Sequence, residues 1–228
     1  MHVVKKRMLD PIVCTERSIL WSGENAMTKM TKMKLCGFMQ SCDVEAANRL
    51  KPEYIGFVFA SKSRRYITPA KAAGLKEMLR PDICAVGVFV EEKVETVAEL
   101  LNHHIIDLAQ LHGQEDERYI ERLRQLTDKP IIKAFRIDTE QDIKKAQTSS
   151  ADFILLDSGA GGTGRVFDWN LIQQISRPYF LAGGLGIDNV ERAIEKLHPY
   201  AVDVSSGIET DGRKDLHKME AFVRAVRR

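Results

Sequence analysis

The sequence predicts a single (β/α)8 barrel, the TIM-barrel class of α/β fold, and three observations favour it. From Met33 onward, short apolar segments alternate with amphipathic segments, and about 20–25 residues separate one apolar segment from the next, as in such a barrel. The apolar segments are rich in Val, Ile, Leu and Phe without regular alternation, as expected of strands buried on both faces. The alternative, an open doubly wound sheet, usually carries an early GxGxxG motif, which this chain lacks.

The count of segments matches a closed eight-stranded barrel. Strand character is found in residues 33–38, 54–59, 84–90, 108–113, 131–137, 153–158, 179–184 and 201–207. Helical character is found in residues 43–50, 69–79, 94–102, 116–126, 139–147, 169–175, 187–197 and 215–226. Thr68 followed by Pro69 is a helix start signal, and Asp138 and Thr139 both offer a cap for the segment 139–147.

Composition excludes several classes of protein. The chain has 228 residues, 44% hydrophobic and 29% charged, as is typical of a globular protein with one sizeable core. A net charge of +2 indicates neither a nucleic-acid nor a membrane partner, and no apolar run reaches the roughly 18 residues of a membrane span. The four cysteines form no CxxC pair and no cluster with histidine, so we expect reduced thiols, a cytoplasmic protein and no metal site.

The first 31 residues differ from the rest. They have a basic start, but no continuous apolar segment and no small-residue cleavage site, so they make a poor signal peptide. We expect residues 1–31 to be an extension outside the barrel and residues 32–228 to form the barrel domain. An apolar arm that docks on the barrel is the alternative.

Several predicted strands end in chemistry-bearing or glycine-rich sequence. Because the carboxyl ends of all barrel strands face one mouth, these strand ends should lie together. The residues at these strand ends are Cys36, the loop ASKSRRY after Phe59, His112, Arg136, Asp157, Gly183-Gly184 and Ser205-Ser206-Gly207. This inventory of a thiol, a carboxylic acid, basic groups and small-residue loops predicts an enzyme site that holds an anion.

The motifs KLCGF, GFVFASKSRRYITP, VGVFV, QLHGQE, ILLDSGAGGTGRVFDW, LAGGL and VDVSSGIE…GRKD closely resemble those of the phosphoribosylanthranilate isomerases of tryptophan biosynthesis. The resemblance runs from about Lys34 to the C-terminus. It implies an Amadori rearrangement of N-(5′-phosphoribosyl)anthranilate to 1-(o-carboxyphenylamino)-1-deoxyribulose 5-phosphate. The reaction needs a general acid and a general base but no cofactor.

Matching family positions imply the catalytic roles. Asp157 becomes the acid that protonates the furanose ring oxygen, and Cys36 the base that removes the C2′ proton. Arg65 becomes the partner of the anthranilate carboxylate, a task that suits a planar guanidinium. From the residues alone, Cys36 could instead be a core thiol, Asp157 a helix cap or solvated acid, and Arg65 a solvated loop arginine like its neighbour Arg64.

The remaining candidates bind substrate. His112, with Gln110, is a candidate for orienting it, and a structural histidine is the alternative. Asp203 matches a family position near the sugar hydroxyls, with a strand-end cap as the alternative. The phosphate is expected over the last three loops, at Gly162, Gly164, Gly183, Gly184, Ser206 and Gly207, because glycines let backbone N–H groups approach an anion.

Two other functions are alternatives. The related sugar isomerase of histidine biosynthesis, or a dual-substrate version, binds two phosphates with glycine loops in both halves of the barrel, but VGVFVEE and QLHGQE are not diglycine loops. A non-catalytic phosphate-binding barrel would not need Cys36 and Asp157 together. We therefore expect an isomerase with one small-molecule substrate, a phosphorylated sugar–anthranilate. We expect it to be a monomer, with a dimer as the alternative.

Overall fold

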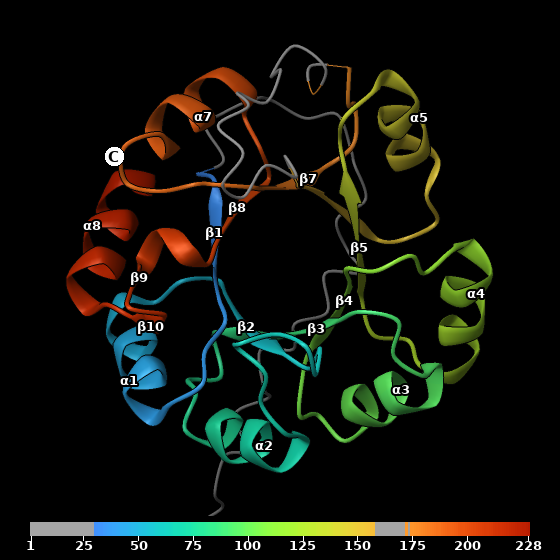
Figure 1. Cartoon of the computed structure of the whole chain (residues 1–228), viewed down its shortest axis with the longest axis horizontal. Coiled ribbons are helices and arrows are strands. Elements are labelled where there is room, and N and C mark those ends of the chain that lie inside the picture. The colour runs from blue at the N-terminus through green and yellow to red at the C-terminus, as the bar shows by residue number, and fades with distance from the viewer. Residues whose placement is uncertain (1–29, 158–171, 173) are drawn as a thin grey trace, which may run out of the picture.

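The predicted (β/α)8 barrel is confirmed. The computed structural model describes residues 30–157, 172 and 174–228. Within these residues, eight parallel strands close into a barrel in the order of the sequence, and the helices surround it (Figure 1). The last strand pairs with the first, in a register that runs from Lys32 opposite Ala201 to Leu35 opposite Val204, and this pairing closes the barrel.

The elements follow the predicted order. The barrel strands are β1 (Lys32–Cys36), β2 (Tyr54–Val58), β3 (Cys84–Phe89), β4 (Leu108–Leu111), β5 (Ile131–Arg136), β6 (Phe153–Asp157), β7 (Tyr179–Ala182) and β8 (Ala201–Val204). The helices are α1 (Ser41–Leu50), α2 (Pro69–Glu77), α3 (Val94–Asn102), α4 (Glu117–Leu126), α5 (Glu140–Thr148), α7 (Val190–Leu197) and α8 (Leu216–Val226). Most of the helix expected over 169–175 lies outside the described residues.

Local signals explain where the elements begin and end. Thr68 caps α2, because its hydroxyl oxygen accepts a hydrogen bond from the Lys71 N–H. Thr139, rather than Asp138, caps α5. The observed strands are up to three residues shorter at their carboxyl ends than predicted. After β7, for example, Gly183 turns the chain with φ +92°.

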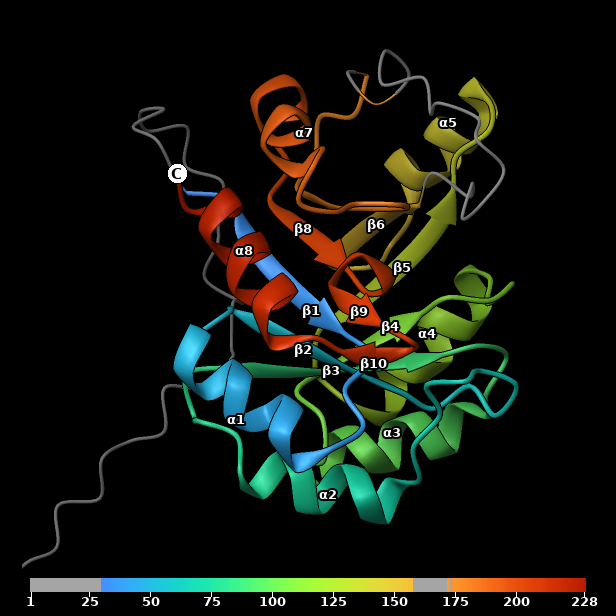
Figure 2. The ribbon, with the colours of Figure 1, turned by 60° about the vertical axis from the view of Figure 1, so that its left-hand side comes forward.

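One short feature was not predicted. After β8, a 3-10 turn, η2 (Ser206–Ile208), leads into an antiparallel pair of short strands, β9 (Glu209–Thr210) and β10 (Arg213–Lys214). This hairpin lies beside the carboxyl end of β1 (Figure 2). It brings two further charged residues, Glu209 and Lys214, to the strand ends.

The strands are buried on both faces, as their composition predicted. One apolar cluster packs between the strands and the helices and includes Leu35, Phe57 and Phe222. A second cluster fills the inside of the barrel, where the ring of Phe180 makes edge contacts with Tyr54 and Phe153 at centroid distances of 5.4 and 5.8 Å. The interior is therefore a packed core, and the strand ends above it can carry the site.

The cysteines only partly match expectation. Cys36 and Cys42 are free thiols. Cys84 is disulfide-bonded, so the expectation of a reduced thiol is wrong at this position. No helix within the described residues is long and apolar enough to cross a membrane.

Candidate active site

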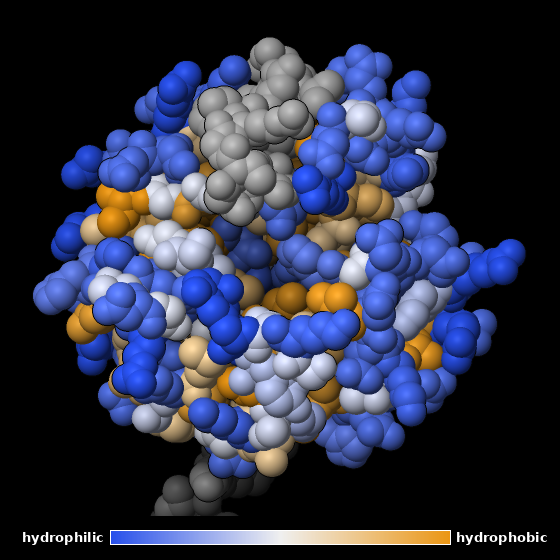
Figure 3. Space-filling model, in the orientation of Figure 1, coloured by the Kyte–Doolittle hydropathy of each residue, from blue (hydrophilic) through white to orange (hydrophobic). Residues whose placement is uncertain are grey.

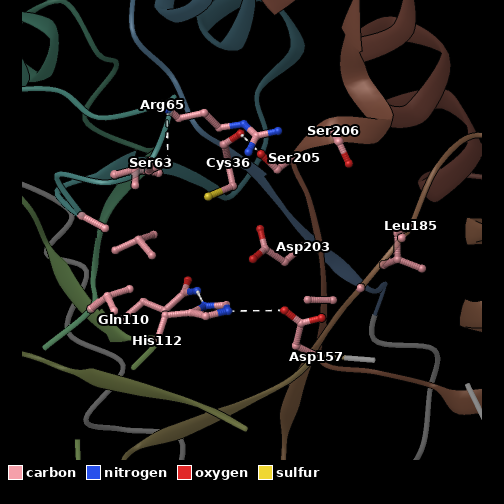
Figure 4. A pocket seen from close by; sticks show the side chains of 17 residues that line it. Cys36, Ser63, Arg65, Gln110, His112, Asp157, Leu185, Asp203, Ser205 and Ser206 are labelled. Carbon is pink, nitrogen blue, oxygen red and sulfur yellow. Dashed lines mark hydrogen bonds and ion pairs between the residues drawn. The ribbon is translucent and has the colours of Figure 1, made fainter. Parts of the chain in front are cut away.

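A cavity of about 390 Å³ lies at the carboxyl ends of the barrel strands. It is visible as the hollow near the centre of the space-filling view (Figure 3). Apolar side chains from β2 and β3, including Val58 and Val88, form one part of its wall. Polar side chains form the rest, with Cys36 and Asp157 on opposite sides of the space (Figure 4).

The thiol of Cys36 sits at the end of β1 in a tightly packed environment. Gly56, the neighbour of Cys36 in the β1–β2 register, leaves room for it, because a Cβ at position 56 would lie 2.6 Å from the sulfur. Two residues earlier on β1, Lys34 is fully buried, and its ammonium group donates to both carboxylate oxygens of Asp203, at 2.9 and 3.0 Å. Cys36 and Asp203 line the cavity, and the buried ammonium of Lys34 is bound to the Asp203 carboxylate.

Burial and the neighbouring charges shift the pKa of the Cys36 thiol in opposite directions. Burial is the largest cause and raises the pKa of the Cys36 thiol above its ordinary value. The positive charge of Lys34 is the largest opposing cause, and Lys214 acts in the same direction more weakly. The negative charge of Asp203 adds to the effect of burial. The cations that act on the thiol, Lys34 and Lys214, are identified by the structure.

Asp157 takes part in a short polar chain. The His112 ring nitrogen Nε2 lies 3.3 Å from Asp157 Oδ2, and its other nitrogen, Nδ1, lies 2.8 Å from the amide nitrogen of Gln110. Since the Gln110 amide donates to Nδ1, the imidazole proton belongs on Nε2, where it points to Asp157. Gln110 and His112, the two residues expected to orient the substrate, both line the cavity.

Arg65 lies on the cavity wall and is held by an acidic residue. Its Nε and Nη2 atoms donate to the two carboxylate oxygens of Glu209, at 2.6 and 2.7 Å. Lys214 donates to the same carboxylate at 2.7 Å, and the more exposed Arg64 reaches it at 3.0 Å. These hydrogen bonds outweigh the effect of burial and lower the pKa of Glu209 to about 2. Arg65 is thus ion-paired on one edge, while it also lines the cavity. Arg64 is ion-paired too, unlike the solvated arginine that we expected.

The loop after β7 presents backbone to the cavity. Gly183 and Gly184 have φ values of +92° and +65°, and a Cβ at position 184 would meet nothing within 4 Å. Asn189 ties this loop together by accepting from the Gly186 N–H at 2.9 Å and donating to the Gly184 carbonyl at 3.0 Å. Gly207 packs against it, since a Cβ there would lie 2.2 Å from the Leu185 carbonyl oxygen. Glycine is needed at 207 for this contact between loops.

Comparison with known proteins shows the family. The sequence profile described as N-(5′-phosphoribosyl)anthranilate (PRA) isomerase matches residues 33–225. The N-(5′-phosphoribosyl)anthranilate isomerase of Endomicrobium trichonymphae is 44% identical over 202 residues, which are 87% of this chain and 99% of the relative. The chain belongs to the phosphoribosylanthranilate isomerase family.

Two solved structures support the assignment. A crystal structure of a phosphoribosylanthranilate isomerase in complex with reduced 1-(o-carboxyphenylamino)-1-deoxyribulose 5-phosphate has 33% identity and a TM-score of 0.77, and covers 87% of this chain and 99% of that one. A crystal structure of monomers generated from the dimeric enzyme of Thermotoga maritima has the same identity, TM-score and coverage. Some proteins similar to this one are therefore dimeric.

The family, the fold and the isomerase activity predicted from the sequence are thus confirmed. The chain is an isomerase of tryptophan biosynthesis, and its reaction converts N-(5′-phosphoribosyl)anthranilate to 1-(o-carboxyphenylamino)-1-deoxyribulose 5-phosphate. The related isomerase of histidine biosynthesis and the non-catalytic barrel are not supported.

The structure brings most of the predicted site residues of this isomerase together. Those that line the cavity are Cys36, Arg65, His112, Asp157, Gly183, Gly184, Asp203 and Ser206. Gly162 and Gly164 lie outside the described residues. Arg136 pairs with Asp138 at 2.8 Å, and both side chains are exposed. The described residues contain no cluster of histidine, cysteine or carboxylate groups that could hold a metal ion.

Sequence reasoning missed three charged residues of the site: Lys34, Glu209 and Lys214. A signal for Lys34 exists, because residues two apart on a strand point to the same face, so Lys34 shares the face of Cys36. No comparable signal exists for Glu209 and Lys214, because their positions depend on the unpredicted β9–β10 hairpin.

Proposed function

We propose that Asp157 is the general acid and Cys36 the general base of this isomerisation. Asp157 protonates the furanose ring oxygen, so that the C1′–O bond breaks and the ring opens to an iminium ion. Cys36, as thiolate, removes the C2′ proton, which leaves an enolamine that tautomerises to the ketone. The reaction moves protons within one substrate, and no cofactor takes part in these steps.

One observation supports this assignment above the others. Cys36 and Asp157, which lie on β1 and β6, face each other across a cavity with room for the reacting carbons between them (Figure 4). Turnover tests both roles at once. Loss of N-(5′-phosphoribosyl)anthranilate fluorescence should be rapid with the parent protein and strongly slowed by substitution of either residue.

In this proposal, His112 passes a proton from solvent to Asp157 after Asp157 has given up its own. The imidazole Nε2 and the carboxylate Oδ2 are 3.3 Å apart, so a proton can pass between them. After Asp157 has protonated the ring oxygen, His112 returns a proton to it from solvent, to which a third of its side chain is exposed. His112 in this proposal orients and reloads the acid, and Gln110 fixes the imidazole.

The anthranilate group fits the wall that carries Arg65. Two edges of the Arg65 guanidinium differ in function: the edge with Nε is bound by Glu209, and the remaining N–H groups are available to the substrate carboxylate. The apolar side chains of Val58, Val88 and Val90 line the same cavity and would contact the aromatic ring.

Substitution at Arg65 tests this placement. Arg65→Lys loses the planar pair of donors and should weaken substrate binding by about 1–3 kcal/mol, measured as an increase in KM, because hydrogen bonds between charged groups are of this size. Arg64→Lys is the matched control, since the Arg64 side chain is 62% exposed and does not line the cavity. Equal effects at the two positions, or none at either, would contradict the assignment.

The phosphate binds over the loops after β7 and β8 in this proposal. Gly183 and Gly184 present backbone to the cavity with no Cβ in the way, and Ser206 begins the turn η2 opposite them. Backbone N–H groups in such turns carry partial positive charge and bind phosphate. Gly207 supports the site by allowing the two loops to touch.

Thermal unfolding tests the phosphate site. Inorganic phosphate should raise the Tm of the parent protein, because a ligand that binds the folded state stabilises it. Gly184→Val fills the open space in front of the loop and strains a residue at φ +65°, so this protection should disappear. Gly186→Val is the control, because position 186 is equally open but does not line the cavity. Undiminished protection in Gly184→Val places the phosphate elsewhere.

We further propose that Asp203 contacts the sugar hydroxyls with the face of its carboxylate that lines the cavity. We also propose that the protein acts as a monomer in the cytoplasm. Residues 1–31 form an extension, and the barrel domain spans 32–228. The first barrel strand begins at Lys32, whose backbone N–H donates to the Tyr200 carbonyl.

A further inference from the structure

We propose that Lys34 is a positioning residue whose positive charge favours the thiolate form of Cys36, and that Asp203 limits this effect. The ammonium of Lys34 is bound to the Asp203 carboxylate, and Lys34 lies two residues before Cys36 on the same strand, so the charges of both groups act on the thiol. This inference rests on the proposed role of Cys36 in catalysis. Its test, however, measures the ionisation of the Cys36 thiol directly and does not depend on turnover.

The geometry of the strands brings the three groups together. Lys34 and Cys36 are two residues apart on β1 and point to the inside of the barrel. Lys34 is paired with Asp203 in the β1–β8 register, and its Nζ lies 2.9 and 3.0 Å from the two carboxylate oxygens. All three side chains are buried, so water does not screen their charges effectively.

Stability does not explain this ion pair. A fully buried lysine and carboxylate lose their hydration, and well-packed apolar residues in their place are often as stable or more stable. The barrel interior next to the pair is already apolar, with Tyr54, Val86 and Phe180 in one cluster. A charged pair at this position, directly beside the proposed base, therefore indicates a role in the chemistry.

The other charges around Cys36 are compensated. Lys214 on β10 and Arg65 in the loop after β2 both act on the thiol, but both are bound to the carboxylate of Glu209. From β2 and β3, the uncharged residues Gly56, Val58 and Val88 pack against Cys36. Figure 4 places His112 and Asp157 on the far side of the cavity.

Lys34 is ion-paired too, but unlike Lys214 and Arg65 it lies on the same strand as Cys36, two residues away and on the same face. Of the causes that lower the pKa of Cys36, its charge is the largest, and Cys36 and Asp203 together keep the pKa of Lys34 above its ordinary value despite the opposing effect of burial. The charged form of Lys34 is thus favoured.

The proposal predicts opposite effects for the two partners of the pair. Lys34→Met removes the cation and leaves the Asp203 anion beside the thiol, so the thiolate should form only at higher pH. Asp203→Asn removes the anion and leaves the cation, so the thiolate should form at lower pH. General damage to the barrel interior would change both variants in the same direction.

The experiment follows alkylation of Cys36 by iodoacetamide as a function of pH, with peptide mass spectrometry to separate the two free thiols. Only the thiolate reacts, so the midpoint of the pH profile reports its formation. At pH 7, Lys34→Met should slow alkylation of Cys36 at least about tenfold, since a neighbouring opposite charge shifts such a group by one unit or more. Asp203→Asn should shift the midpoint to lower pH. The exposed Cys42 is the internal control and should not change.

A matched variant controls for the loss of a buried lysine. Lys133→Met breaks the buried Lys133–Glu115 ion pair, which braces the loops after β3 and β4 away from Cys36. It should lower the Tm but leave the Cys36 midpoint unchanged. The double variant Lys34→Met/Asp203→Asn should have a midpoint between those of the two single variants.

Each outcome of this experiment either supports or overturns the proposed role of Lys34. Opposite shifts for Lys34→Met and Asp203→Asn support the proposal, and shifts in one direction, or none, overturn it. The acidic limb of kcat should follow the same order. If the alkylation midpoints separate but that limb stays fixed, Lys34 controls the thiol and it is the assignment of Cys36 as base that fails.

Discussion

Replacing Asp157 by asparagine is expected to lower kcat by roughly 10²–10⁴-fold, the usual contribution of a proton-transfer group. Asparagine has the size of aspartate and can still accept the hydrogen bond from His112, so the local structure should survive. It has no proton to give to the ring oxygen, so ring opening should become the slow step. Turnover of N-(5′-phosphoribosyl)anthranilate, followed by its fluorescence, measures the effect, and KM should change little.

Two further variants serve as comparisons for Asp157→Asn. Asp138→Asn removes an exposed carboxylate that follows the neighbouring strand β5 and should leave kcat near the parent value. His112→Gln should lower kcat by less than Asp157→Asn does, because His112 acts through the carboxyl group. Near-normal turnover by a folded Asp157→Asn protein would exclude Asp157 as the acid.

Replacing Cys36 by alanine or serine should reduce kcat by a similar factor, roughly 10²–10⁴-fold. Alanine removes the base. Serine keeps the shape, but its hydroxyl does not ionise in the range where a thiol does. The side chain packs against Gly56, Val58 and Val88, so alanine should also cost about 1 kcal/mol in the free energy of unfolding, and serine separates this packing effect from the chemical one.

The control for this pair is Cys42→Ser, at an exposed thiol on α1 that does not line the cavity. It should keep both the kcat and the Tm of the parent. The pH profile offers a second check, because the acidic limb assigned to the Cys36 thiolate should vanish in Cys36→Ala. A serine variant that turns over at the parent rate would show that another group removes the C2′ proton.

Strand and helix positions were largely predictable because the signals are local. Apolar runs gave all eight strands in order, and the Thr68-Pro69 pair marked the start of α2 correctly. The carboxyl ends of the strands were placed less well, since the last residues of each motif belong to turns. At Gly183, for example, φ is +92°, and the strand has already ended at Ala182.

The site was predictable in its list of residues but not in its contacts. Cys36, His112 and Asp157 could be named because strand ends in a parallel barrel meet at one mouth, and Arg65 was named from the resemblance to the family. Their partners come from distant parts of the chain. Glu209, which binds Arg65, is 144 residues away from it, and no short-range pattern connects the two.

By itself, the sequence determined the architecture and the family of this protein, because apolar periodicity and strand-end motifs are local features of the chain. Only the tertiary structure decided the electrostatics of the site. The charge that acts on Cys36 depends on Lys34, and the charge of Lys34 depends on Asp203, 169 residues further on and 2.9 Å away in space. Coulomb interactions depend on distance and burial, and both exist only once the barrel has closed.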